Sequence, residues 1–245
     1  MIRTANPALN ANTFEVPMTT ADRMTLSGTV NKTGILLLIL LVGTLFTWNT
    51  RNPETNGVWM LVGSIGGFIV AMVTVFKKEW APVTAPIYAA MQGLFIGGIS
   101  SIFEAVYPGI VLQTCLLTFG TLGALLIAYS TGKIKPTENF KLGLVAATGG
   151  IALVYLVSMI LGFFHVNIPL IHGSGIVGIG FSIVVVIIAA LNLVMDFDFI
   201  ENGCNAGAPK YMEWYAAFGL MVTLVWLYIE ILRLLVKLRN RRTSM

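Results

Sequence analysis

Charged residues are scarce in this chain of 245 residues. Only 11% of the residues are Asp, Glu, Lys or Arg, whereas a soluble domain has roughly 25%. Hydrophobic residues make up 56% of the chain, and the mean hydropathy is +0.84. This composition argues against a soluble globular protein and favours a chain that lies mostly inside a membrane.

Cysteine is also scarce, and common catalytic motifs are absent. The only two cysteines, Cys115 and Cys204, lie far apart, so they indicate neither a disulfide framework nor a metal site. No His-Glu-x-x-His or Gly-x-Ser-x-Gly motif is present, and we therefore expect no enzyme and no cofactor. His165 and His172 flank a predicted turn with no third ligand near them, which favours interfacial side chains over a metal site.

The chain has instead seven long apolar runs. A hydrocarbon core about 30 Å thick needs roughly 20 helical residues, and backbone groups in lipid must bond locally. The runs are Gly34–Thr50, Gly57–Phe76, Ala85–Val106, Val111–Tyr129, Leu142–Phe164, Gly173–Met195 and Trp214–Val236. We predict an all-α integral membrane bundle of seven helices over residues 34–238. A polar N-terminal tail (1–33) and a basic C-terminal tail (239–245) flank the bundle, and the lipid bilayer is its first partner.

Lysine and arginine lie almost entirely between the runs, which argues against a nucleic-acid partner and indicates orientation. The N-terminal tail and the even-numbered loops carry nine of these residues, against one, Arg51, in the odd-numbered loops. The positive-inside rule therefore predicts a cytoplasmic N-terminus. The C-terminal end carries five more (Arg233, Lys237, Arg239, Arg241 and Arg242), and seven full crossings would place this basic end on the opposite side. Either the protein tolerates a basic end there, or one of the apolar runs does not fully cross the membrane.

Glycines occur inside the runs at a spacing that permits close helix contact. Gly63 and Gly67, and likewise Gly93 and Gly97, are separated by three residues. Small residues at this spacing let helix backbones approach each other. We interpret them as packing within one molecule, with dimerisation as the alternative.

Acids within or at the ends of apolar runs are the main functional signal, because an ionisable group in a membrane is costly and usually faces a cavity or a partner. These acids are Glu104, Asp196, Asp198, Glu213 and Glu230. Glu230 has Arg233 three residues later, so it either forms a structural ion pair or belongs to an ion path. Glu104, one turn before Pro108, either reaches the interface or belongs to such a path.

Asp196 and Asp198 follow the apolar run Ile183–Met195. Two residues apart on a helix, their side chains point about 200° from each other. Asn192 lies four residues before Asp196 and shares its face, which predicts that Asp196 faces inward and Asp198 faces the cytoplasmic rim. An inward carboxyl group can exchange a proton or hold a hard cation. The alternative is an acid that faces cytosolic water at a helix end.

Three segments together resemble a known family. They are the run Gln92–Ser100 followed by Phe103-Glu104, the segment Leu193–Asp196, and the segment Trp226–Leu235. The chain resembles the Bax-inhibitor membrane proteins, specifically the bacterial YccA/Bax-inhibitor-like branch, over roughly residues 34–238. The resemblance implies a seven-helix bundle with the last helix in its middle, in a bacterial plasma membrane. It also implies a pH-gated calcium leak that uses two aspartates in the last two spans and a basic residue near the end of the second.

Position by position, the first of these aspartates falls on Asp196 and the second on Thr223, which cannot ionise. Glu230, two turns further along the same face, is the candidate replacement. The basic residue corresponds to Lys77 or Lys78. We expect no cofactor, with calcium only as the transported ion.

Two function hypotheses follow from these observations. The first is a passive or pH-gated cation leak. The second is a regulator or scaffold that moves no ion and binds a membrane protease or another integral membrane protein.

Overall fold

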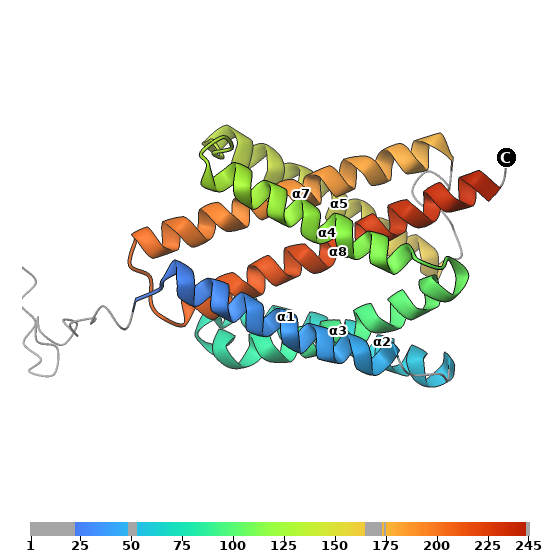
Figure 1. The fold of residues 1–245 in the computed structure, drawn as a ribbon, viewed down its shortest axis with the longest axis horizontal. Coiled ribbons are helices and arrows are strands. Elements are labelled where there is room, and N and C mark those ends of the chain that lie inside the picture. The colour runs from blue at the N-terminus through green and yellow to red at the C-terminus, as the bar shows by residue number, and fades with distance from the viewer. Residues whose placement is uncertain (1–22, 49–52, 165–172, 174, 244–245) are drawn as a thin grey trace, which may run out of the picture.

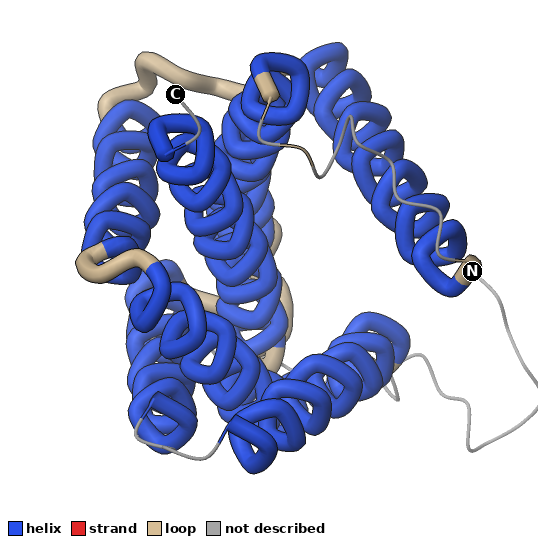
Figure 2. Tube along the Cα trace, turned by 90° about the vertical axis from the view of Figure 1, so that its right-hand side faces the viewer, coloured by secondary structure: helices blue, strands red, loops and turns tan. Residues whose placement is uncertain are grey.

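Seven long helices and one short 3-10 helix make up the computed structural model, which describes residues 23–48, 53–164, 173 and 175–243. The elements are α1 (Leu26–Trp48), α2 (Pro53–Phe76), η3 (Lys78–Trp80), α3 (Ala81–Val106), α4 (Ile110–Ser130), α5 (Glu138–Phe163), α7 (Ile176–Asn205) and α8 (Met212–Thr243). Figure 1 shows these helices running roughly along one axis, and Figure 2 shows no strand among the described residues. All seven long helices are long and apolar enough to cross a membrane, which confirms the predicted fold class.

Several helices extend beyond the apolar runs that predicted them. Helix α1 begins at Leu26 rather than Gly34, α7 continues past Met195 to Asn205, and α8 includes most of the predicted basic tail. The first case has a clear cause: the hydroxyl of Thr25, directly before α1, accepts a hydrogen bond of 3.0 Å from the backbone N–H of Gly28. Such an N-cap bond satisfies an N–H group in the first turn and stabilises the start of a helix ahead of its apolar run.

The junction between α2 and α3 is short and contains the 3-10 helix η3. Helix α3 begins at Ala81, with Pro82 in its first turn and Pro86 inside it. A proline in the first turn costs no hydrogen bond, because the N–H groups there have no partner within the helix. The predicted turn residues near Asn167, both histidines and Arg51 lie outside the described residues.

Glycines bring α3 into backbone contact with α1 and α2. A Cβ atom added to Gly93 would lie 2.3 Å from the carbonyl oxygen of Leu40 and 3.0 Å from the Cα of Gly43, both on α1. A Cβ added to Gly63 of α2 would lie 2.5 Å from the carbonyl oxygen of Met91. The predicted use of these glycines for packing within the molecule is confirmed.

Helix α8 packs against four of the other long helices, namely α1, α3, α4 and α7. Of the described spans it is the most buried, and its Leu227 and Ile231 pack against Ala189 and Leu193 of α7. Helix α2 lies outside this group against α3, and α5 lies against α7. A position in the middle of all six other helices stays a prediction.

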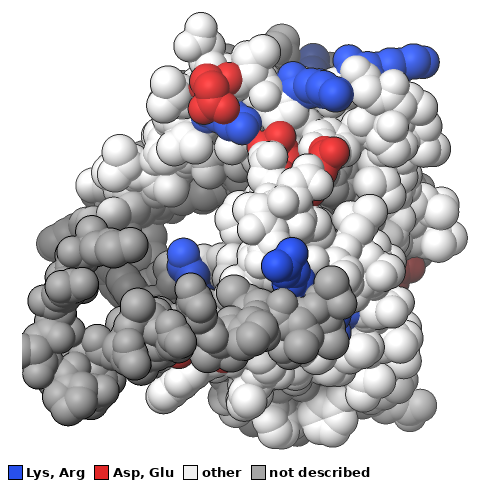
Figure 3. Space-filling view, turned by 90° about the vertical axis from the view of Figure 1, so that its left-hand side faces the viewer, with Lys and Arg blue, Asp and Glu red and all other residues white. Residues whose placement is uncertain are grey.

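The first helix begins, and the last helix ends, on opposite sides of the bundle. Figure 1 shows the start of α1 at one end and the C-terminus of α8 at the other, as an odd number of crossings requires. Lysine and arginine side chains are visible on the end where α1 begins (Figure 3). The basic C-terminal part of α8 therefore lies at the other end, away from these lysines and arginines.

Candidate functional site

Helices α7 and α8 are antiparallel neighbours, and polar groups recur between them every seven residues. On α8 these positions are Thr223, Glu230 and Lys237. Residues seven apart lie on nearly the same side of a helix, since the drift is about 20°. We call the polar residues along this contact the polar seam; it consists of Asp196 and Ser182 of α7 and Thr223, Glu230 and Lys237 of α8.

Asp196 and Thr223 form one end of the polar seam. Their side chains lie close enough to interact across the contact between α7 and α8, and the Thr223 hydroxyl donates to the Gly219 carbonyl of its own helix at 3.3 Å. The second carboxyl oxygen of Asp196, Oδ2, is buried and has no hydrogen-bond partner among the described residues. Most buried polar atoms have a partner, so this oxygen is an acceptor available for a proton or a cation.

Asp198 points elsewhere, toward the bundle end where α5 begins. Its Oδ2 lies 2.9 Å from the ammonium of Lys141 and accepts a hydrogen bond of 2.9 Å from the Asn202 side chain. The predicted difference in direction between Asp196 and Asp198 is therefore observed. Asn192, expected on the face of Asp196, instead donates to the hydroxyl of Thr148 on α5 at 2.9 Å.

Glu230 occupies the middle of the polar seam and is 1% exposed. Its Oε1 accepts hydrogen bonds from the Tyr155 hydroxyl (2.9 Å) and from the Arg233 guanidinium (3.1 Å). Arg233 also donates to the Tyr155 hydroxyl at 2.7 Å and lies over the Tyr155 ring, 5.1 Å from its centre. Of the two predictions for Glu230, the ion pair with Arg233 is thus present, and Tyr155 of α5 adds a hydrogen bond to it.

The other end of the polar seam is formed by Lys237 and Ser182. The Lys237 ammonium donates to the Ser182 hydroxyl at 2.8 Å and to the Gly178 carbonyl at 3.0 Å. The same antiparallel register that pairs Asp196 with Thr223 thus pairs Ser182 with Lys237. By the same register, the small residue Ala189 of α7 lies opposite Glu230.

The remaining predicted residues lie away from the polar seam. Glu104 accepts hydrogen bonds from the backbone N–H groups of Gly109 (2.6 Å) and Val111 (3.0 Å), so it holds the turn that starts α4. The Lys78 ammonium lies 5.4 Å from the centre of the Tyr215 ring. Lys77 is exposed, and neither lysine forms an ion pair with a described acid.

Glu213 was among the acids singled out in the sequence but received no specific role; it lies in the first turn of α8 and is fully buried. Its carboxylate lies 2.8 Å from the ammonium groups of both Lys32 and Lys210. It also accepts from the backbone N–H and the hydroxyl of Thr25. A Cβ on Gly28 would lie 2.0 Å from this carboxylate, so the glycine makes room for it. In the sequence, only Lys210, three residues before Glu213, could have indicated one of these ion pairs.

A comparison with known families supports this architecture. The family described as Bax inhibitor 1 like matches residues 6–240, which is nearly the whole chain. The chain belongs to the Bax inhibitor 1 like family. No curated protein and no solved structure matches it.

For this Bax inhibitor 1 like protein, the polar seam offers carboxyl, hydroxyl and ammonium groups rather than a metal cage. Among the described residues, no three His, Cys, Asp or Glu side chains are grouped so that they could hold a metal ion. The available acceptor is the single free oxygen of Asp196, beside the Thr223 hydroxyl. Chemically, the seam can bind and release one proton, or contact a cation transiently.

Proposed function

We propose that this Bax inhibitor 1 like protein is a cation leak controlled by the protonation of Asp196, in the bacterial YccA-like branch of the family. The observation that carries this proposal is the buried, unpartnered Oδ2 of Asp196 inside an apolar bundle. An acid at such a depth is costly and usually serves an ion or proton path. Calcium is the ion that the family resemblance implies.

Only one acid of the polar seam is available for this role. Arg233 and Tyr155 already compensate Glu230, while Thr223 supplies a hydroxyl where a second aspartate was expected. Two strongly interacting carboxyl groups titrate as a coupled pair, whereas one group titrates alone. We therefore propose a pH response governed by a single proton, which changes occupancy by at most about tenfold per pH unit.

The test is calcium flux through the purified full-length protein in liposomes across a pH series. Asp196→Asn should change the flux and flatten its pH dependence, because the ionisable group is gone. Asp198→Asn removes the same charge two residues away and should keep the wild-type pH profile. Thr223→Asp should introduce a second, coupled titration. Wild-type flux at every pH from Asp196→Asn would remove Asp196 from the mechanism.

A regulator that binds another integral membrane protein is the second candidate. The observation that favours it is an apolar groove of about 550 Å³ between α1 and α4, with α8 as its floor. Leu38, Leu41 and Phe119 lie along it. A regulator that transports nothing would show no flux above that of empty liposomes, in the wild type and in Asp196→Asn alike.

For localisation we propose the plasma membrane of a bacterium with the N-terminus in the cytoplasm. The support is the family resemblance together with the nine-to-one distribution of lysine and arginine between the two sets of loops. A reporter fused after Met245 should then lie on the non-cytoplasmic side.

A further inference from the structure

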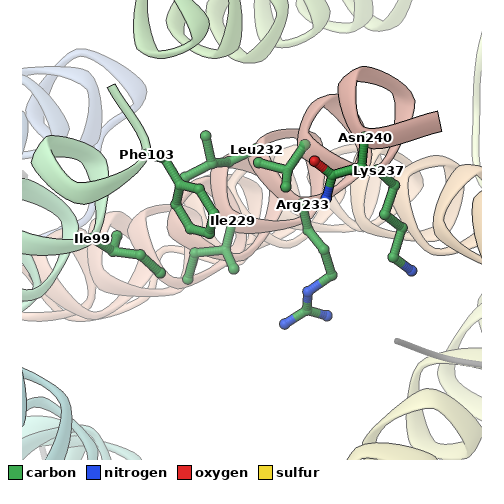
Figure 4. Close-up of a pocket in the computed structure, with 8 residues that line it drawn as sticks. Ile99, Phe103, Ile229, Leu232, Arg233, Lys237 and Asn240 are labelled. Atoms are coloured by element: carbon green, nitrogen blue, oxygen red, sulfur yellow. The ribbon is translucent and has the colours of Figure 1, made fainter. Parts of the chain in front are cut away.

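A small cavity lies beside α8 near the C-terminal end of the bundle (Figure 4), with a volume of about 270 Å³. Its lining residues are Ile99, Phe103, Ile229, Leu232, Arg233, Val236, Lys237 and Asn240. Phe103 is in the last turn of α3, so the cavity lies where the membrane-crossing part of that helix ends. This is the depth at which lipid headgroups begin.

Arg233 supplies hydrogen-bond donors that the described part of the chain does not use. One nitrogen, NH1, makes all the hydrogen bonds to Tyr155 and Glu230. The nitrogens Nε and NH2 have no hydrogen-bond partner among the residues that the structure describes, and the side chain is 36% exposed. A guanidinium has five N–H donors in a planar fork that fits two oxygens of a phosphate group.

Two other polar residues complete this side of the cavity. The Asn240 side-chain oxygen accepts a hydrogen bond from the Tyr107 hydroxyl, which turns its amide group into the cavity rim. Lys237 adds a positive charge while its ammonium donates to Ser182. In Figure 4 Arg233 and Lys237 extend from the same side of α8.

Among the described residues, cations outnumber acids at the cavity. Glu230 is the acid that faces Arg233, and it offsets one cation. Lys237 also lines the cavity and contributes a second cation. The nearby acid Glu104 is occupied by backbone N–H groups.

The opposite wall is apolar. Ile99 and Phe103 of α3 face Ile229 and Val236 of α8 across the cavity. Hydrophobic side chains at headgroup depth, next to a guanidinium with spare donors, match a ligand with a charged head and an apolar tail. Basic pockets between membrane helices bind anionic headgroups for the same reason.

We propose that this cavity binds the phosphate group of an anionic phospholipid. The Nε and NH2 groups of Arg233 hold the phosphate oxygens, Asn240 donates from the rim, and the acyl chain lies along Ile99 and Phe103. The site is independent of the proposed ion leak.

The experiment titrates the full-length protein in detergent with dioleoyl-phosphatidylglycerol, dioleoyl-phosphatidylcholine or inorganic phosphate, and counts bound molecules by native mass spectrometry. Phosphatidylglycerol should bind at least about tenfold more tightly than phosphatidylcholine, because both lipids carry the phosphate but only phosphatidylcholine adds a trimethylammonium group, which the positive charges of Arg233 and Lys237 repel. Inorganic phosphate should bind more weakly than phosphatidylglycerol, because it has no chain to contact Phe103.

Asn240→Asp is the main variant, because it keeps the acceptor for Tyr107 and leaves Arg233 with Glu230. It should weaken phosphatidylglycerol binding about tenfold by charge repulsion, and Arg233→Gln should weaken it at least as much. Lys135→Gln makes the same change in net charge at the opposite end of the bundle and should leave binding unchanged.

Three results would overturn the proposal. Equal affinity for the two lipids would exclude recognition of the anionic head. Equal losses in Asn240→Asp and Lys135→Gln would show that overall charge, rather than this cavity, attracts the lipid. Inorganic phosphate that binds as tightly as phosphatidylglycerol would show a phosphate site without lipid specificity.

Discussion

Two contacts in this bundle bring helices together in different ways. One is the contact of α3 with α1 and α2, and the other is the contact of α7 with α8. In the first, glycines such as Gly93 and Gly63 bring backbones together, with a carbonyl oxygen where a Cβ would otherwise lie. In the second, the side chain of Lys237 bridges α8 to Ser182 and Gly178 of α7, and beside it Glu230 links α8 to Tyr155 of α5. Both contacts lie inside an apolar chain, yet only the second contains groups that can change charge.

The glycine contacts therefore give structural support, whereas the polar seam contains the groups that can change charge. Backbone contacts are van der Waals contacts that depend on shape and respond to added volume. The polar seam depends on charge balance, and it responds to the loss of one partner. Substitutions can therefore be chosen that disturb one contact and leave the other intact.

The largest expected effect is on the polar seam. Arg233→Met should destabilise the protein by about 3 kcal/mol or more, because Glu230 then stays buried without a cation. The measurement is reversible unfolding in mixed micelles. The double variant Glu230→Gln/Arg233→Met removes both charges and should recover part of the loss. A single variant as stable as wild type would mean that the pair contributes nothing.

A smaller effect is expected in the glycine-packed contact. Gly93→Ala should cost about 2 kcal/mol, because the new Cβ would meet the Leu40 carbonyl oxygen at 2.3 Å and the backbones must separate. The matched control is Gly123→Ala on α4, where no atom lies within 4 Å of the added Cβ. This control should be neutral or stabilising by up to about 1 kcal/mol. Equal unfolding midpoints for the two variants would contradict the comparison.

The smallest effect tests a single neutral hydrogen bond beside the polar seam. Thr148→Val removes the acceptor of the Asn192 side chain, which keeps its second partner, the Ile188 carbonyl at 2.8 Å. The expected loss is about 0.6 kcal/mol, the average for such bonds between membrane helices. Ser64→Ala, which removes an exposed bond within one helix, is the control and should show no measurable loss. A loss above about 2 kcal/mol would indicate that Thr148 supports more than this bond.

The sequence predicted local features of the site better than distant ones. The Glu230–Arg233 pair was predicted because residues three apart on a helix are neighbours by geometry alone. The direction of Asp196 relative to Asp198 followed from the same helical geometry. Tyr155, which binds both Glu230 and Arg233, was not predicted, since nothing in its own segment marks it.

The helix ends were predicted less well than the helices themselves. Hydropathy detects where apolar residues stop, but α1 includes a polar first part that Glu213 and Thr25 anchor to α8. The start of α1 therefore depends on a contact between residues 188 positions apart. Such a contact leaves no trace in the local pattern.

Seven membrane-crossing helices were determined by the sequence alone, because each long apolar run must satisfy its backbone hydrogen bonds internally once it is in lipid. The tertiary structure decided which polar groups meet. The register of α7 against α8 sets Asp196 beside Thr223 and Ser182 beside Lys237. A shift of one turn would move each helix by about 5.4 Å and separate all of these pairs. That register results from side-chain packing along the whole contact, and no single segment of the chain contains it.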